Sequence, residues 1–132
     1  MPNVKYSGSK GIVQSTGSGQ FHVSGVGIAH DVEEKTLNNP AGIVDIASHG
    51  PTLITNTAGD NTVRVLNPAD AGTGTAGQQK LVVLSSLAAG NVTVRSVASN
   101  DLIGDPMTAA GDYCLLVWTG SDWVVAAEVT TA

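Results

Sequence analysis

The chain has 132 residues and a net charge of −5 at pH 7, and its length suits one domain with one core. Its six basic residues are scattered, which argues against direct binding of nucleic acid, because phosphate recognition needs a local basic patch. Charged residues make up 13% of the chain, below the roughly 25% usual in soluble domains. We therefore expect part of the surface to be hidden in an oligomer, the alternative being a neutral monomer kept soluble by Ser, Thr and Asn.

Membrane insertion and secretion find no support in the sequence. No run approaches the roughly twenty apolar residues that span a bilayer, and the opening MPNVKYSGSK lacks the apolar centre of a signal peptide. We expect synthesis in a cytoplasm and no membrane partner. The single cysteine, Cys114, lies in an apolar run and is predicted to be a small core residue.

The first third of the chain is irregular. Residues 1–20 are rich in Gly, Ser and Thr and are predicted to form a flexible arm, ordered only where it meets a partner, ahead of a β-sandwich domain at 21–132. Residues 20–28 alternate polar and apolar positions and predict the first strand of the body. The segment 30–39 carries three acidic residues before Pro40, which predicts a solvated loop or one helical turn outside the core.

From residue 43 onwards, short β-branched runs recur at intervals of about ten to fifteen residues, separated by turn residues. Their spacing predicts an all-β sandwich or barrel with very little helix. The predicted strands are Ile43–Ala47, Thr52–Asn56, Thr62–Leu66, Lys80–Leu84, Asn91–Ala98, Tyr113–Trp118 and Trp123–Val129.

These runs differ in expected burial. Residues 61–65 and 91–97 alternate cleanly and predict half-exposed strands, with Val92 and Val94 turned inward. Residues 81–84, Leu-Val-Val-Leu, are continuously apolar. This run predicts a strand that is central in a sheet or lies between subunits.

The last two runs form a predicted hairpin around a turn at residues 119–122. The expected cross-strand pairs are Trp118 with Trp123, Leu116 with Val125 and Cys114 with Ala127 on one face, and Val117 with Val124 and Leu115 with Ala126 on the other. Both faces are apolar, so the second must be covered by another sheet of the chain or by another subunit. Leu116, Trp118, Trp123 and Val125 are therefore predicted to lie in a subunit interface or in the core.

No group of residues predicts catalysis or a cofactor. His22, His30 and His49 lack the spacing of a local metal site, and the acidic cluster at 31–34 beside His30 is more typical of a solvated loop. No nucleophile stands in a recognised catalytic motif, so we expect no enzyme, no metal and no cofactor. The two tryptophans could form a sugar-binding platform, although core or interface packing is the favoured interpretation.

The order of motifs in residues 50–130 resembles β-rich structural modules of tailed bacteriophages. The likeness lies in residues 54–56 (ITN), the strand at 61–66, the stretch 77–84, the strand at 91–94 and the closing hairpin motif at 111–125. Similar motifs occur in head decoration proteins, head fibres and tail fibres. The short chain, without collar or coiled-coil segments, most resembles a capsid decoration, or cement, protein.

The resemblance implies a homotrimer of β-sandwich or jelly-roll subunits on the exterior of the expanded capsid. Such a trimer clamps neighbouring major capsid subunits and stabilises the virion through several weak contacts acting together. Within the arm, Val4, Tyr6, Ile12 and Val13 are the candidates for capsid contact. The alternative function is that of a receptor- or glycan-binding domain of a phage head or tail fibre, which would require exposed aromatic side chains.

Overall fold

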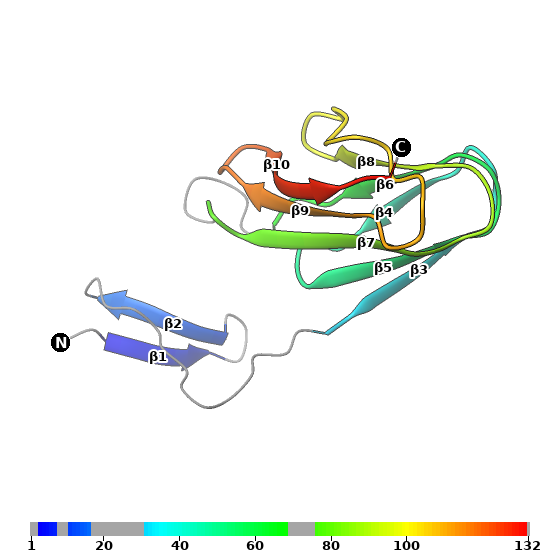
Figure 1. Ribbon diagram of the computed structural model, residues 1–132. Helices are drawn as coiled ribbons and strands as arrows, with labels where there is room; N and C mark the ends of the chain where they lie inside the picture. Colours follow the sequence, from blue (N-terminus) through cyan, green and yellow to red (C-terminus); the bar gives the residue numbers. More distant parts are fainter. Residues whose placement is uncertain (1–2, 8–10, 17–30, 69–75, 132) are drawn as a thin grey trace.

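A computed structural model of the chain describes residues 3–7, 11–16, 31–68 and 76–131. The described residues form ten strands and no helix, so the prediction of an all-β protein is confirmed. The strands belong to a five-stranded sheet, a three-stranded sheet and a separate two-stranded ribbon (Figure 1).

The two-stranded ribbon lies within the predicted arm. Strand β1 (Asn3–Ser7) pairs antiparallel with β2 (Gly11–Thr16). The four candidate capsid-contact residues are on this ribbon: Val4 and Tyr6 on β1, Ile12 and Val13 on β2. The predicted strand at 20–28 lies outside the described residues.

The body contains eight strands whose chain order alternates between two sheets up to β8. They are β3 (Glu33–Leu37), β4 (Ile43–Ile46), β5 (Pro51–Asn56), β6 (Asn61–Val65), β7 (Gln79–Leu87), β8 (Val92–Ser96), β9 (Tyr113–Trp118) and β10 (Trp123–Val129). The large sheet has the order β10-β9-β7-β5-β3, and the small sheet has the order β4-β6-β8. The run at 81–84 belongs to β7, in the middle of the large sheet, which confirms the prediction that it is a central strand.

Parallel pairing is the main departure from expectation. Strands β3, β5 and β7 are parallel to one another, and so are β4, β6 and β8. A jelly roll is built from antiparallel strands, so that finer part of the fold prediction is not confirmed. Each pair β3/β4, β5/β6 and β7/β8 instead forms one coil of a short β-solenoid, here called coils 1, 2 and 3.

The coils stack with a regular register. Glu33 aligns with Thr52 and Ile43 with Thr62, so coils 1 and 2 are 19 residues apart. Asn61 aligns with Val92, 31 residues further on, because the connection from β6 to β7 is longer. The antiparallel hairpin β9/β10 then pairs with β7 and completes the large sheet (Figure 1).

The turns between the sheets stack so closely that two glycines are required. A Cβ atom on Gly90 would lie 2.1 Å from the carbonyl carbon of Gly59, and a Cβ on Gly59 would lie 2.9 Å from Cβ of Pro40. Gly59 and Gly90 also have positive φ, at 56° and 71°. These positions admit no side chain because the turn of each coil lies directly on the turn of the coil before it.

The core fills the space between the two sheets. Its members are apolar side chains that alternate along both sheets and the loop after β8. They are Leu37, Ile46, Ile54, Val63, Val65, Val82, Leu84, Val92, Val94, Ile103, Met107, Cys114, Leu116, Trp118 and Trp123. Val92 and Val94 are buried, which confirms the prediction that these two side chains of β8 point inward.

One segment predicted to be a surface loop proves to be an edge strand that contributes Leu37 to the core. Residues 33–37 form β3 and not a loop or helical turn, and Leu37 is only 2% exposed. Parallel pairing with β5 fixes the backbone of these residues, which overrides their polar composition. As an edge strand carrying Glu33, Glu34 and Lys35, β3 has the charge that natural edge strands commonly show.

Candidate functional site

The closing hairpin provides the starting point for the candidate site. Its turn lies at residues 119–122 as predicted, with Thr119 N donating to Asp122 O. Trp118 aligns with Trp123, Val117 with Val124 and Leu116 with Val125, which confirms these three pairs. The indole rings of Trp118 and Trp123 meet edge to face with centroids 5.4 Å apart.

Beyond Val125 the register shifts by one residue. Leu115 aligns with Ala127 and Cys114 with Glu128, so the predicted pairs Leu115 with Ala126 and Cys114 with Ala127 are wrong. The extra residue in β10 forms a β-bulge, which the alternation of apolar residues does not reveal.

The predicted interface-or-core residues lie on the inner side of the hairpin. Leu116, Trp118 and Trp123 are at most 3% exposed, and Val125 packs against the core from its margin. Trp123 also donates its indole N–H to the carbonyl oxygen of Leu66 across the core, at 3.1 Å. The three-stranded sheet of the same chain therefore covers this face of the hairpin.

The opposite face of the large sheet is mostly apolar across β10, β9, β7 and the start of β5, with Glu34, Thr36 and Thr55 on its β3 side, and no described strand covers it. The register places eleven uncharged side chains on it, and we call this surface the outer apolar face. Its members are Pro51, Leu53, Gln79, Leu81, Val83, Tyr113, Leu115, Val117, Val124, Ala127 and Val129. Val124 and Val129 are 46% and 48% exposed. A sheet face in contact with water would instead carry mainly polar side chains.

A hollow interrupts the outer apolar face. It has a volume of about 300 Å³ and is lined by Gly50, Pro51, Gln79, Leu81 and Leu115. Its walls come from β5, β7 and β9 and the turn before β5, so it lies on the part of the face away from β10. A shallow apolar recess of this size admits one or two small apolar side chains.

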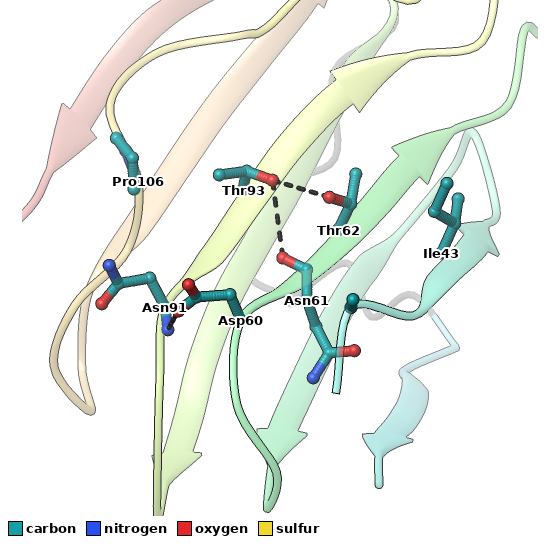
Figure 2. Close-up of a pocket in the computed structure, with 8 residues that line it drawn as sticks. Ile43, Asp60, Asn61, Thr62, Asn91, Thr93 and Pro106 are labelled. Atoms are coloured by element: carbon teal, nitrogen blue, oxygen red, sulfur yellow. Dashed lines mark hydrogen bonds between the residues drawn. The ribbon is translucent and has the colours of Figure 1, made fainter. Parts of the chain in front are cut away.

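A second hollow lies on the outer side of the small sheet, where the turns begin (Figure 2). Its volume is about 360 Å³, and its polar lining includes Asp60, Asn91, Thr62 and Thr93 beside exposed Ile43. The hydroxyl oxygens of Thr62 and Thr93 are 2.9 Å apart, and Asp60 Oδ1 accepts a hydrogen bond from the backbone N–H of Asn91. Carboxylate and amide groups of this kind can hydrogen-bond a polyhydroxylated ligand.

Lys80 is the most unusual ionisable group of the described core. It is 1% exposed, and its Nζ donates to Thr52 Oγ1 at 2.5 Å and to the carbonyl oxygen of His49 at 3.3 Å. Burial lowers the pKa of Lys80 to about 8, although attraction to Glu33 opposes the shift. This interior network holds β5 and β7 together.

Of the acidic cluster that was weighed as a metal site, Glu33 forms hydrogen bonds within the protein, whereas Asp31 and Glu34 are exposed. Glu33 Oε1 accepts hydrogen bonds from Ala47 N at 3.0 Å and from Thr52 Oγ1 at 2.9 Å. Burial raises the pKa of Glu33, but these hydrogen bonds and nearby lysines outweigh that effect and hold it below its usual value. Within the part of the chain that the structure describes, no three His, Cys, Asp or Glu side chains are grouped to hold a metal ion. His22 and His30 lie outside that part.

Cys114 is the core residue that the sequence predicted. It is 3% exposed, and burial, followed by the charge of Glu128, raises the pKa of its thiol to about 12. A thiol with so high a pKa is almost entirely protonated at neutral pH and therefore reacts slowly. Across the described strands and loops there is no helix of the length and hydropathy that crossing a bilayer requires.

Comparison with known proteins adds no family. No protein-family model matches the chain, and no curated protein is significantly similar to it.

Proposed function

We propose that this chain is a structural protein of a tailed-phage virion that decorates and stabilises the expanded capsid as a homotrimer. The observation that carries the proposal is the outer apolar face, which is suited to association between subunits. The motifs in residues 50–130 that resemble phage decoration modules supply the biological setting. The partners are then other copies of the chain and the major capsid protein.

The rigid solenoid suits a protein that stabilises a capsid shell. Its turns are stacked without space for a side chain at Gly59 and Gly90, and hydrogen-bonded parallel strands join all three coils. A rigid body of this kind loses little conformational entropy on binding. Three such bodies joined in one particle gain strongly from simultaneous weak contacts with a capsid lattice.

Co-sedimentation with capsids tests this function. Purified protein is mixed with expanded capsids and, in parallel, with unexpanded capsids of the phage that encodes it. The proposal expects saturable binding to expanded capsids alone, because linkage then stabilises only the mature lattice. Equal binding to both forms, or to neither, would reject the decoration function.

Deletion of residues 1–20 tests the proposed role of the arm. The truncated chain is expected to keep the melting temperature of its body and to lose most of its capsid affinity. Unchanged affinity would remove Val4, Tyr6, Ile12 and Val13 from the contact and leave the body as the capsid-binding part.

The alternative function, glycan recognition by a fibre domain, has one observation in its favour and one against. The hollow beside Asp60 and Asn91 offers polar groups to a saccharide (Figure 2). Trp118 and Trp123, the aromatic side chains proposed for stacking on sugars, are buried. Binding on a glycan array that is lost in Asp60→Ala and retained in Asp45→Ala, an exposed aspartate of the same sheet, would favour this alternative.

A further inference from the structure

The outer apolar face calls for a covering partner on physical grounds. Apolar side chains from four adjacent strands, exposed on β10 and half-buried on β5, β7 and β9, form one surface, and burying it is favourable by about 25 cal/mol for each Å² removed from water. Monomeric proteins rarely leave such a patch open.

The charge of the face indicates what kind of partner fits. None of its eleven side chains is charged. Glu34 of β3, which pairs with Leu53 of β5, marks the margin of the face. A charged partner would lose hydration there and find no opposite charge. A second copy of this chain, although its net charge is −5, would bring an equally uncharged surface to the contact.

The two sides of the face differ in shape. On the side of edge strand β10, Val124 is 46% exposed, whereas the side formed by β7 and β5 contains the hollow beside Leu81. When a projecting residue and a recess occupy different parts of one surface, copies can associate head to tail, and such a contact closes into a ring if the rotation permits.

The area of the face sets the strength of each contact between copies. Four strands at about 4.8 Å spacing, and about 20 Å along each strand, give a face of roughly 400 Å². A ring of three divides the face of each subunit between two neighbours, so each contact buries roughly 400 Å² in total, which is typical of a weak contact, and closure of the ring makes the three contacts act together.

We propose that the outer apolar face joins copies of this chain head to tail around a threefold axis, with Val124 of one subunit seated in the hollow beside Leu81 of the next. This inference rests on the proposed homotrimer and identifies its contact surface.

Cysteine cross-linking tests the contact directly. The double variant Val124→Cys/Leu81→Cys is oxidised at low protein concentration and analysed by denaturing electrophoresis without reductant. An internal disulfide is excluded because two interstrand spacings separate these positions, and their Cα atoms are more than 7 Å apart. Buried Cys114 does not compete.

The expected products are covalent dimers and trimers, with neither single variant forming them. Covalent dimers alone would reveal a twofold contact and overturn the threefold arrangement. Absence of any cross-linked product would overturn the pairing of Val124 with Leu81.

A charge variant checks the surface without relying on disulfide geometry. Val124→Asp should shift the particle from trimer to monomer in analytical ultracentrifugation, and Ile43→Asp, at a 64% exposed position on the other sheet, should remain trimeric. If the Val124→Asp protein is trimeric, the outer apolar face is not the contact surface, although the homotrimer itself is not contradicted. A wild-type monomer would refute both, whereas a trimer that fails to bind capsids would refute only the decoration function.

Discussion

The side chain of Asn61 donates a hydrogen bond through Nδ2 to Oδ1 of Asn56, 2.9 Å away and fully buried. This pair links the turns of all three coils. Asn61 Oδ1 accepts from the backbone N–H of Gly42 in coil 1, and Asn56 Nδ2 donates to the carbonyl oxygen of Ala89 in coil 3. The two amides therefore satisfy backbone groups that the stacked turns would otherwise bury without partners.

Asn61→Ala is expected to destabilise the protein by about 1 to 3 kcal/mol, because the amide of Gly42 and Oδ1 of Asn56 then keep only their longer hydrogen bonds, to Asn39 O and from Ala58 N. Asn91→Ala, at an exposed position in the turn of coil 3, is the matched control and should change stability by less than about 0.5 kcal/mol. Urea unfolding measures both. Equal effects would show that the buried amide pair contributes nothing specific.

Gly90→Ala is expected to cost at least about 3 kcal/mol, because the new methyl group would collide with the backbone of Gly59 in addition to straining a positive φ. Gly111→Ala has a positive φ as well, but nothing lies within 4 Å of its added Cβ. Its cost should be the conformational strain alone, about 1 kcal/mol. Thermal unfolding of the two variants separates stacking from strain, and similar melting temperatures would argue against close stacking of the coils.

Asp112 anchors the end of the chain. Its carboxylate, 1% exposed, accepts hydrogen bonds from the backbone of Thr108 and Ala109 and from both the backbone and hydroxyl of Thr131. Burial raises the pKa of Asp112, but these hydrogen bonds outweigh burial and hold the pKa below its usual value of 3.8. Its stabilisation is therefore present above pH 3.8 and is lost as the pH falls through the lowered folded pKa.

Asp112→Asn is expected to lower the unfolding free energy at pH 7 by about 2 to 3 kcal/mol, because a neutral amide accepts these hydrogen bonds less well. The difference from wild type should shrink as the pH falls below 3.8. Melting curves between pH 7 and pH 2 measure this, with Asp101→Asn, at an exposed carboxylate, as the control. A difference that stays constant down to pH 2 would exclude a role for ionised Asp112.

Lys80 changes stability in the same direction as Asp112, but at higher pH. Its folded pKa of about 8 lies below the ordinary 10.5, so between these pH values the unfolded chain binds more protons. The unfolding free energy should thus rise with pH across this window, by up to about 3 kcal/mol. Lys80→Met should abolish this rise, whereas Lys35→Met, at a partly exposed lysine, should keep it. Chemical denaturation at pH 7.5 and pH 10 measures the unfolding free energy of each variant. If the unfolding free energy of Lys80→Met rises as much as that of wild type, burial of Lys80 is not the cause of the rise.

Local pattern was enough to predict most of the strands. Seven predicted runs, from Ile43 to Val129, coincide with β4 to β10 within a few residues, because alternation of apolar side chains reports directly which residues face a core. The pairing of Trp118 with Trp123 followed from the short turn, which fixes hairpin register. The register failed only beyond the bulge after Val125.

The parallel coils were missed because alternation does not distinguish parallel from antiparallel pairing. Ala-Gly at 58–59 and at 89–90 lies in turns that stack on one another, but the same dipeptide also occurs at 41–42, 71–72, 76–77 and 110–111, out of step with the coils. Leu37, Asn56 and Leu87 align across coils 1 to 3. Because the coils are 19 and then 31 residues apart, the sequence has no fixed period that a search for internal repeats could detect.

The sequence predicted part of the candidate site. The two-sided apolarity of the hairpin predicted a cover for each face, and the small sheet provides it for one of them, but the pattern could not tell which face met the core. The structure places Leu116, Trp118 and Trp123 inside, which leaves Leu115, Val117 and Val124 on the outer apolar face. Facing of this kind depends on where the second sheet lies, which is a long-range property.

The number of copies of this protein on the virion tests the central claim most directly. Mass-spectrometric quantification of purified virions, calibrated with labelled peptides, gives the ratio of this chain to the major capsid protein. A capsid-decorating homotrimer predicts a fixed ratio near one to one across preparations. A few copies per particle, or none, would contradict the decoration function and indicate a fibre or a protein outside the virion.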